Sequence, residues 1–206
     1  MSIRISPTII CPTGGIRRLA ASYRERRPPV TIATPRLLLR PWRPEDLAPF
    51  AALNADARVM RHFPSTLTEA ETVALLDRIG AHFQTHGWGL WAAELTATAQ
   101  CIGFIGLSVP RFQAHFTPCV EIGWRLAAAH WNQGLATEGA LAAVRFGFDT
   151  LGLEEIVSFT VEANLPSRRV MEKIGMTHDP GDDFAHPNLP ADHPLSRHVL
   201  YRRRRA

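Results

Sequence analysis

The stretch that most restricts the fold of this chain is VEIGWRLAAAHWNQGLATEGALAAVRFGFD, residues 120–149. Its first seven residues alternate along the chain, which predicts a strand, and its second half repeats apolar residues at spacings of three and four, which predicts a helix. A short loop around Gly134 and Ala136 joins them. Backbone N–H groups can approach an anion at such a loop, and the helix adds the positive end of its dipole. Taken alone, the junction is equally compatible with ordinary α/β structure.

Turn and capping residues divide the rest of the chain. Thr68 and Glu71 form a capping box that predicts a helix start, and Gly87 and Gly152 suit helix ends. The expected strands cover residues 37–39, 88–95, 101–109, 120–126, 155–162 and 198–201. The expected helices cover residues 44–53, 68–87, 135–151 and 167–173. Two early helices, a meander of strands and a final strand–helix–strand unit predict one α/β domain.

The positive charge of the chain is concentrated at its ends. The formal net charge is +4, but residues 1–31 hold six arginines and one glutamate, so residues 32–206 together carry −1. We therefore expect residues 1–31 to be a mobile basic arm and residues 32–206 to be the folded domain. The mildly acidic body argues against a nucleic-acid partner.

The cysteines and apolar segments indicate the compartment. Cys11, Cys101 and Cys119 are odd in number and lack CxxC spacing, which favours a reducing, cytoplasmic location. No apolar run is long enough to cross a membrane, so no membrane partner is expected. Nine histidines are present without an HExxH motif, so no metal site is expected. The late histidines could instead line a ligand pocket: His186, His193 and His198.

Two expected strands carry polar residues on a face that a central strand should keep apolar. Glu121 and Arg125 share one face of the strand at 120–126, and Ser158, Thr160 and Glu162 share one face of the strand at 155–162. The two strands either flank a groove for a polar ligand or leave this face open to solvent. The residues alone do not decide between these alternatives.

Two motifs taken together give the chain a family resemblance. With the opening TPRLLLRPW and the strands GWGLWAAE and CIGFIGL, the motifs WNQGLATEG and ANLPSRRVMEKIGM resemble the GNAT superfamily of acyl-CoA N-acyltransferases. The likeness covers roughly Ile32 to Met176 and is strongest to the ribosomal-protein-alanine N-acetyltransferase branch. It implies an α/β fold with a mixed, mostly antiparallel central sheet, splayed between its fourth and fifth strands and flanked by helices. The pantetheine arm of acetyl-CoA would enter the splay.

The resemblance also implies a function. It indicates an acetyl-CoA-dependent N-acetyltransferase that modifies a primary amine, on a protein N-terminus or a small molecule, by direct attack in a ternary complex. The alternative is a catalytically weak acyl-CoA-binding sensor or partner module. Met171 keeps this alternative open, because many relatives have a tyrosine at that position. The acceptor and the oligomeric state, including a homodimer, are left open.

Particular residues follow from the resemblance. Glu121 is expected to be the base that accepts the amine proton, with Glu94 and Glu162 as reserves. Ser167 is expected to donate a proton to the leaving thiolate; the alternative is that the thiolate leaves with the help of water and without a dedicated acid. Trp131 stands where relatives often have glutamine or arginine, and we expect it to pack beneath the loop. The residues expected to bind acetyl-CoA are Trp124, Leu126, Asn132, Gln133, Gly134, Leu135, Ala136, Thr137, Asn164, Ser167, Arg168, Met171 and Lys173.

Overall fold

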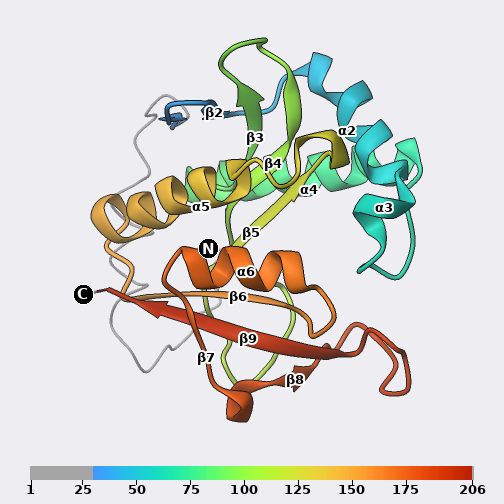
Figure 1. Ribbon diagram of the computed structural model, residues 1–206, viewed down its shortest axis with the longest axis vertical. Helices are drawn as coiled ribbons and strands as arrows, with labels where there is room; N and C mark the ends of the chain where they lie inside the picture. The colour runs from blue at the N-terminus through green and yellow to red at the C-terminus, as the bar shows by residue number, and fades with distance from the viewer. Residues whose placement is uncertain (1–29, 206) are drawn as a thin grey trace, which may run out of the picture.

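The computed structural model describes residues 30–205 (Figure 1). All but the last two residues of the expected basic arm lie outside this range. The strands are β1 (Ile32–Ala33), β2 (Leu37–Arg40), β3 (Leu90–Leu95), β4 (Cys101–Ser108), β5 (Glu121–Leu126), β6 (Glu155–Val161), β7 (Thr177–His178), β8 (Phe184–Ala185) and β9 (Arg197–Arg204). The α-helices are α2 (Leu47–Ala55), α3 (Ala57–Met60), α4 (Glu69–His86), α5 (Leu135–Arg145) and α6 (Leu165–Lys173). Short helical turns cover Pro44–Asp46, Ala128–His130, Phe146–Thr150 and Pro180–Asp182.

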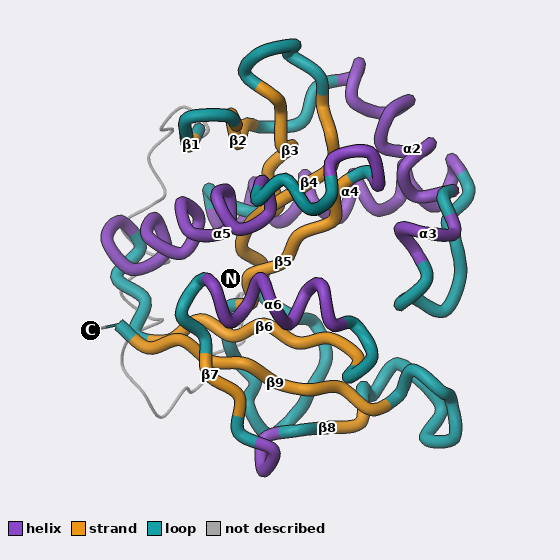
Figure 2. Tube along the Cα trace, in the orientation of Figure 1, coloured by secondary structure: helices purple, strands orange, loops and turns teal. Residues whose placement is uncertain are grey.

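The strands form one sheet with the order β1-β2-β3-β4-β5-β6-β9-β7, and β8 pairs with β9. All the pairs are antiparallel except β5 with β6, which is parallel. Helices α5 and α6 lie next to each other over this sheet (Figure 2). Both faces of the sheet are covered at β4. Ile105 packs on one face in the cluster with α5, and its neighbour Phe104 packs on the other face in the cluster with α2. No helix of the described residues is long and apolar enough to cross a membrane.

Small residues bring α5 close to the sheet. Gly139, Ala140 and Ala143 are buried on its inner face, and a Cβ atom at Gly139 would overlap the Ile105 side chain. The apolar spacing predicted this helix correctly, but it placed Leu141 on the inner face, where the structure has it half-buried. The small residues decide the close approach, because a larger side chain would force the helix away from β4.

The sheet opens between β5 and β6. A single residue pair, Glu121 with Val157, is in ladder register between these strands. The Val157 N–H donates to the carbonyl oxygen of Val120 at 2.9 Å, and the Ser158 hydroxyl donates to that of Ile122 at 2.9 Å. Beyond this point the strands part. Without the two-residue β1, β5 and β6 are the fourth and fifth strands, so the expected splayed sheet is confirmed.

Most elements lie within a few residues of their expected positions, and the short strands β1 and β8 were not expected. The Thr68–Glu71 capping box forms as predicted. Helix α3 was not predicted; the Asp56 carboxylate starts it by accepting from the Arg58 N–H at 2.9 Å. Strand β9 extends to Arg204, beyond its expected end. The positive charge of this strand is neutralised in part by Glu155, whose carboxylate lies 2.7 Å from the Arg202 guanidinium.

Candidate active site

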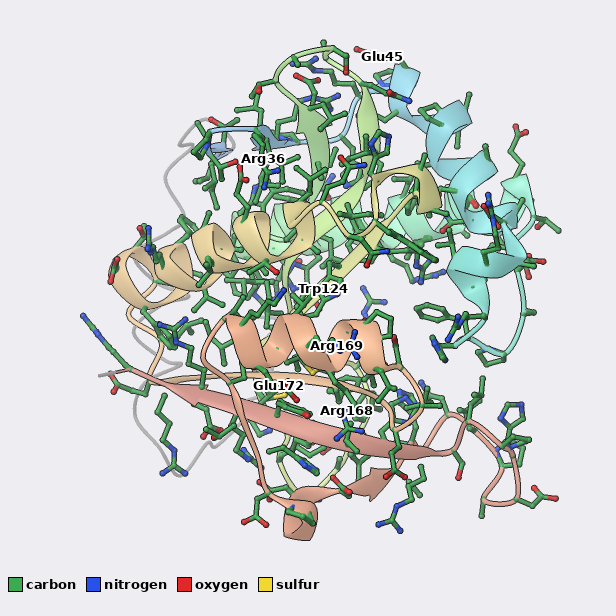
Figure 3. All side chains as sticks on the ribbon, viewed as in Figure 1. Arg36, Glu45, Trp124, Arg168, Arg169 and Glu172 are labelled. Atoms are coloured by element: carbon green, nitrogen blue, oxygen red, sulfur yellow. The ribbon has the colours of Figure 1, made fainter. Side chains whose placement is uncertain are left out.

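A cavity of about 940 Å³ occupies the place where β5 and β6 part. It extends from the start of α5 to the segment after α3 and to the chain around β8 and β9. The Trp124 side chain lies between α5 and α6 in Figure 3 and forms part of the wall. The cavity therefore connects the predicted anion-binding loop with the polar face of β5.

The loop before α5 leaves the start of that helix open. Gly134 is its N-cap residue, has φ 77°, and provides no capping side chain. A left-handed φ favours glycine, and a helix without a capping side chain presents free N–H groups at its first turn. These donors and the helix dipole suit a phosphate group.

Arg36 of the segment before β2 braces this loop from outside the cavity. Its Nη1 donates to the carbonyl oxygen of Gln133 at 2.8 Å, and its Nε donates to the Glu138 carboxylate at 2.7 Å. The same carboxylate accepts from the Thr34 hydroxyl at 2.7 Å. Two positions of the loop and helix are thus tied to a segment about a hundred residues earlier.

Glu121 lies on β5 opposite Ser108 of β4 and lines the cavity. Its carboxyl group makes no ion pair with any residue in the described range 30–205. Burial raises the pKa of Glu121 to about 8, because the walls of the cavity disfavour the charged form. A carboxyl group with this pKa can take up or release a proton close to neutral pH.

Arg125 lies on the same face of β5 and also lines the cavity. Its Nη1 donates to Asn54 Oδ1 at 2.7 Å, and its guanidinium carbon stands 4.3 Å from the centre of the Phe63 ring. Burial lowers the pKa of Arg125 to about 10, so it remains charged at neutral pH. Because Glu121 and Arg125 both face the cavity, their polar face is explained by a groove rather than by open solvent.

Helix α6 forms the opposite wall. The Asn164 side chain caps the helix by accepting from the Ser167 N–H at 3.3 Å, and its amide donates to the Thr160 hydroxyl at 2.9 Å. Ser167 and Met171 both line the cavity, although Met171 is only 1% exposed. The cap therefore fixes the position of Ser167 relative to β6.

The cavity brings together most of the residues expected at the site. Two expected cofactor residues do not line it, Gln133 and Arg168. The Gln133 amide donates to the carbonyl oxygen of Ala129 at 3.0 Å, and Arg168 donates to the Tyr201 hydroxyl at 3.2 Å. Expected residues that line it are Glu121, Trp124, Leu126, Asn132, Gly134, Leu135, Ala136, Thr137, Asn164, Ser167, Met171 and Lys173.

The structure disfavours the reserve bases and relocates Trp131. Glu94 is buried in an ion pair with Arg40 at 2.6 Å, away from the cavity, and Glu162 is exposed. Trp131 is 39% exposed at the cavity wall, and its indole N–H donates to the carbonyl oxygen of Leu126 at 2.8 Å. The expectation that Trp131 packs beneath the loop was wrong, because this hydrogen bond holds the ring at the wall.

The end of the cavity near α3 and β9 contains Phe63, which the sequence did not single out. Phe63 is 39% exposed there, and its place as an apolar residue in the polar segment RHFP is the one signal that the sequence offered. His186 and His198 line the same end, with ring centres 5.0 Å apart, whereas His193 does not. Burial lowers the pKa of both rings. No cluster of residues in the described range could hold a metal ion.

Comparison with known proteins identifies the family. Residues 36–177 match the family model described as "Acetyltransferase (GNAT) domain". The chain therefore belongs to the GNAT acetyltransferase family, and as a member with relatives named N-acetyltransferases it is an enzyme of that class.

Two curated relatives are similar over most of the chain. One is the FsC-acetyl coenzyme A-N(2)-transacetylase of Aspergillus fumigatus, 32% identical over 72% of this chain and 65% of its own length. The alignment thus spans slightly less than two thirds of that fungal protein. The other is YkkB of Bacillus subtilis, 31% identical over 70% of this chain and 84% of its own length.

Solved structures share the fold. An acetyltransferase from Agrobacterium tumefaciens has a TM-score of 0.68 and 29% identity, covering 85% of this chain and 95% of its own. RimJ of Mycobacterium smegmatis, in complex with CoA-disulfide, has a TM-score of 0.68 and 19% identity, covering 85% of this chain and 88% of its own. At that identity the second likeness shows the fold alone.

Proposed function

We propose that the protein is an acetyl-CoA-dependent N-acetyltransferase that modifies a primary amine by direct attack in a ternary complex. The observation that carries this proposal is a continuous cavity that joins the uncapped start of α5 to the carboxyl group of Glu121. A donor held at one end and an amine held at the other would meet inside it. The name of the fungal relative contains acetyl coenzyme A, N(2) and transacetylase, and it supports the same chemistry.

The donor end suits a long anionic cosubstrate. The first N–H groups of α5 would hold a diphosphate, and Lys173 lines the cavity and adds positive charge. Beyond Ile122, β5 has no ladder partner on its β6 side, which leaves backbone groups of Trp124 and Leu126 for the pantetheine amides. The cosubstrate supplies an acetyl thioester with a thiolate leaving group.

Glu121 would accept the proton of the attacking amine. Its raised pKa makes it a stronger base than an exposed carboxylate once it is ionised. In the transfer, the amine nitrogen forms a bond to the carbonyl carbon and the C–S bond breaks. The Glu121 carboxylate takes the amine proton, so the acetylated product leaves neutral at nitrogen.

Ser167 would relay a proton from water to the thiolate sulfur, so that its own hydroxyl group is restored. It lines the cavity on α6, one helical turn before Met171, which carries no hydroxyl group. The Tyr201 hydroxyl is engaged with Glu172 at 3.2 Å and does not line the cavity. Ser167 is thus the hydroxyl group of α6 with access to the reaction.

The proposal is tested in two steps. Acetyl-CoA and CoA should both raise the melting temperature of the protein, because ligands that bind the native state stabilise it. Release of free thiol from acetyl-CoA should then depend on an added amine from a panel of small amines and N-terminal peptides. No melting shift at saturating acetyl-CoA would contradict donor binding. A clear shift without thiol release across the panel would indicate an acyl-CoA sensor.

A further inference from the structure

Arg125 is a half-buried cation that has no carboxylate partner among the described residues. None of the carboxylates within residues 30–205 forms a salt bridge with it, and its Nε is a buried donor without a hydrogen-bond acceptor. The side chain that accepts its hydrogen bond, Asn54, is uncharged. A buried charge without a counter-charge is costly, which suggests that a ligand completes the site.

The guanidinium of Arg125 is held in a fixed position. Asn54 is fully buried, and its amide donates to the Thr72 hydroxyl at 3.2 Å, so the acceptor of the Arg125 bond is itself anchored. The rings of Phe63 and Phe104 lie 4.3 and 5.5 Å from the guanidinium carbon. Aromatic faces and a neutral amide orient the cation without neutralising it.

Most of the charged residues around this end of the cavity are positive. Among the described residues that line the cavity, Glu121 is the sole carboxylate, and the segment around α3 adds Arg58 and Arg61. Arg58 is paired with Asp56 at 2.6 Å, and Arg61 donates to the His62 ring at 2.9 Å. Both are cations, so they leave the positive charge of Arg125 available to a ligand.

Gly123 opens a slot between Glu121 and Arg125. It lies between them on the same face of β5, and a Cβ atom there would meet Glu121 Oε1 at 3.9 Å and Phe104 Cε2 at 4.0 Å. The Cα atoms of Glu121 and Arg125 are about 13 Å apart at the usual rise of a strand. For two side chains that leave the strand in parallel, about 7 Å then remains between the two polar groups of a ligand after one hydrogen bond at each end.

We propose that the acceptor is a small amine that also carries an anionic group, bound with its amine at Glu121 and its anionic group at Arg125. A carboxylate or a phosphate would satisfy the Nε donor of Arg125, and an amine separated from its anionic group by several carbons would span the slot. This inference rests on the proposed function and specifies its substrate class. A protein N-terminus carries no such group at this short distance unless an acidic residue follows it.

The test uses the full chain with a graded panel of acceptors. The distance between amine and carboxylate is varied with glycine, β-alanine, 4-aminobutyrate and 6-aminohexanoate. A phosphonate replaces the carboxylate in 2-aminoethylphosphonate. The acceptors without an anionic group are propylamine and butylamine. We expect the anionic amines to have the higher kcat/KM, with an optimum of chain length. N-terminal peptides with and without an acidic second residue form the other arm of the panel.

Variants isolate the role of Arg125. Arg125→Gln should lower kcat/KM for the preferred anionic amine on the order of 30-fold or more, the effect of removing one partner of a buried charge pair. The loss should be larger for the anionic amine than for butylamine, and the melting shift caused by CoA should persist. Arg125→Lys should recover part of the loss. Arg78→Gln, a change of an exposed arginine on α4, is the matched control and should match the wild type.

Binding provides a readout independent of turnover. In the CoA-saturated protein, the preferred anionic amine should give a calorimetric binding signal that Arg125→Gln removes. Equal use of butylamine and its anionic counterpart, or acetylation of peptides alone, would overturn the inference while leaving the acetyltransferase function intact. Failure of acetyl-CoA to bind would instead overturn the proposed function itself.

Discussion

The Ser158 hydroxyl donates to the carbonyl oxygen of Ile122 at 2.9 Å, at the point where β5 and β6 part. Ser158 is only 2% exposed, so water does not compete for this bond. The ladder between the two strands contains one residue pair. A side-chain hydrogen bond therefore replaces backbone pairing at the opening of the cavity and fixes where the splay begins.

Ser158→Ala should destabilise the protein by about 1 to 2 kcal/mol, because it removes a buried hydrogen bond and leaves a carbonyl oxygen without that donor. Urea unfolding followed by tryptophan fluorescence measures this change. The exposed Ser65 supplies the control, since Ser65→Ala should alter the free energy of unfolding by less than about 0.5 kcal/mol. Equal stabilities of the two variants would show that the bond does not hold the opening.

The pH dependence of turnover should follow the ionisation of Glu121. Its pKa of about 8 means that the basic form appears as the pH rises, so kcat/KM should increase up to about pH 8 and then level off. An arylamine acceptor, neutral throughout this range, separates this effect from ionisation of the acceptor. Glu121→Gln should lower kcat by about 10² to 10⁴ and remove the rise. A flat profile for the wild type would contradict the assignment.

Glu121 should also make stability depend on pH. Its pKa is raised from 4.5 to about 8 on folding, so the folded state binds more protons between these values. The stabilisation is fully present below about pH 4.5 and is lost as the pH rises through about 8. Relative to the wild type, Glu121→Gln should therefore gain about 1 to 3 kcal/mol between about pH 5 and pH 9. Denaturant unfolding at the two pH values measures the difference, and a constant difference would refute the shift.

Arg36 should affect cosubstrate binding more than stability. Its contacts with Gln133 and Glu138 brace the loop, but the Arg36 side chain is 51% exposed, and exposed ion pairs contribute little. We expect Arg36→Ala to raise KM for acetyl-CoA about three- to tenfold and to reduce stability by less than about 1 kcal/mol. Steady-state kinetics and urea unfolding check the two parts. A large loss of stability with unchanged KM would assign Arg36 to the fold alone.

Short sequence patterns predicted the ends of α4 and the loop before α5. The Thr68–Glu71 box and Gly87 frame α4 because helix ends need partners for free backbone groups. Phosphate-loop geometry was visible in the sequence for the same reason, since Gly134 adopts a left-handed φ next to a helix start. These signals involve residues only a few positions apart.

The acceptor end could not be predicted because its contacts are long-range. Arg125 meets Asn54 across 71 positions, and both residues look ordinary in their own segments. Glu94 appeared to be a candidate base until strand pairing placed it beside Arg40. Hydrophobic periodicity predicts the face of a strand or helix on which a residue lies. It does not predict which residue of a distant element will contact that face.

We propose that Glu121 accepts the amine proton during acetyl transfer from acetyl-CoA. The most direct measurement quantifies CoA thiol and acetylated amine together by mass spectrometry, at about pH 8, for the wild type and for Glu121→Gln. We predict that the wild type forms both products in equal amounts. The variant should bind acetyl-CoA with the same melting shift but turn over at least about 100-fold more slowly. Equal turnover by the two proteins would contradict the account.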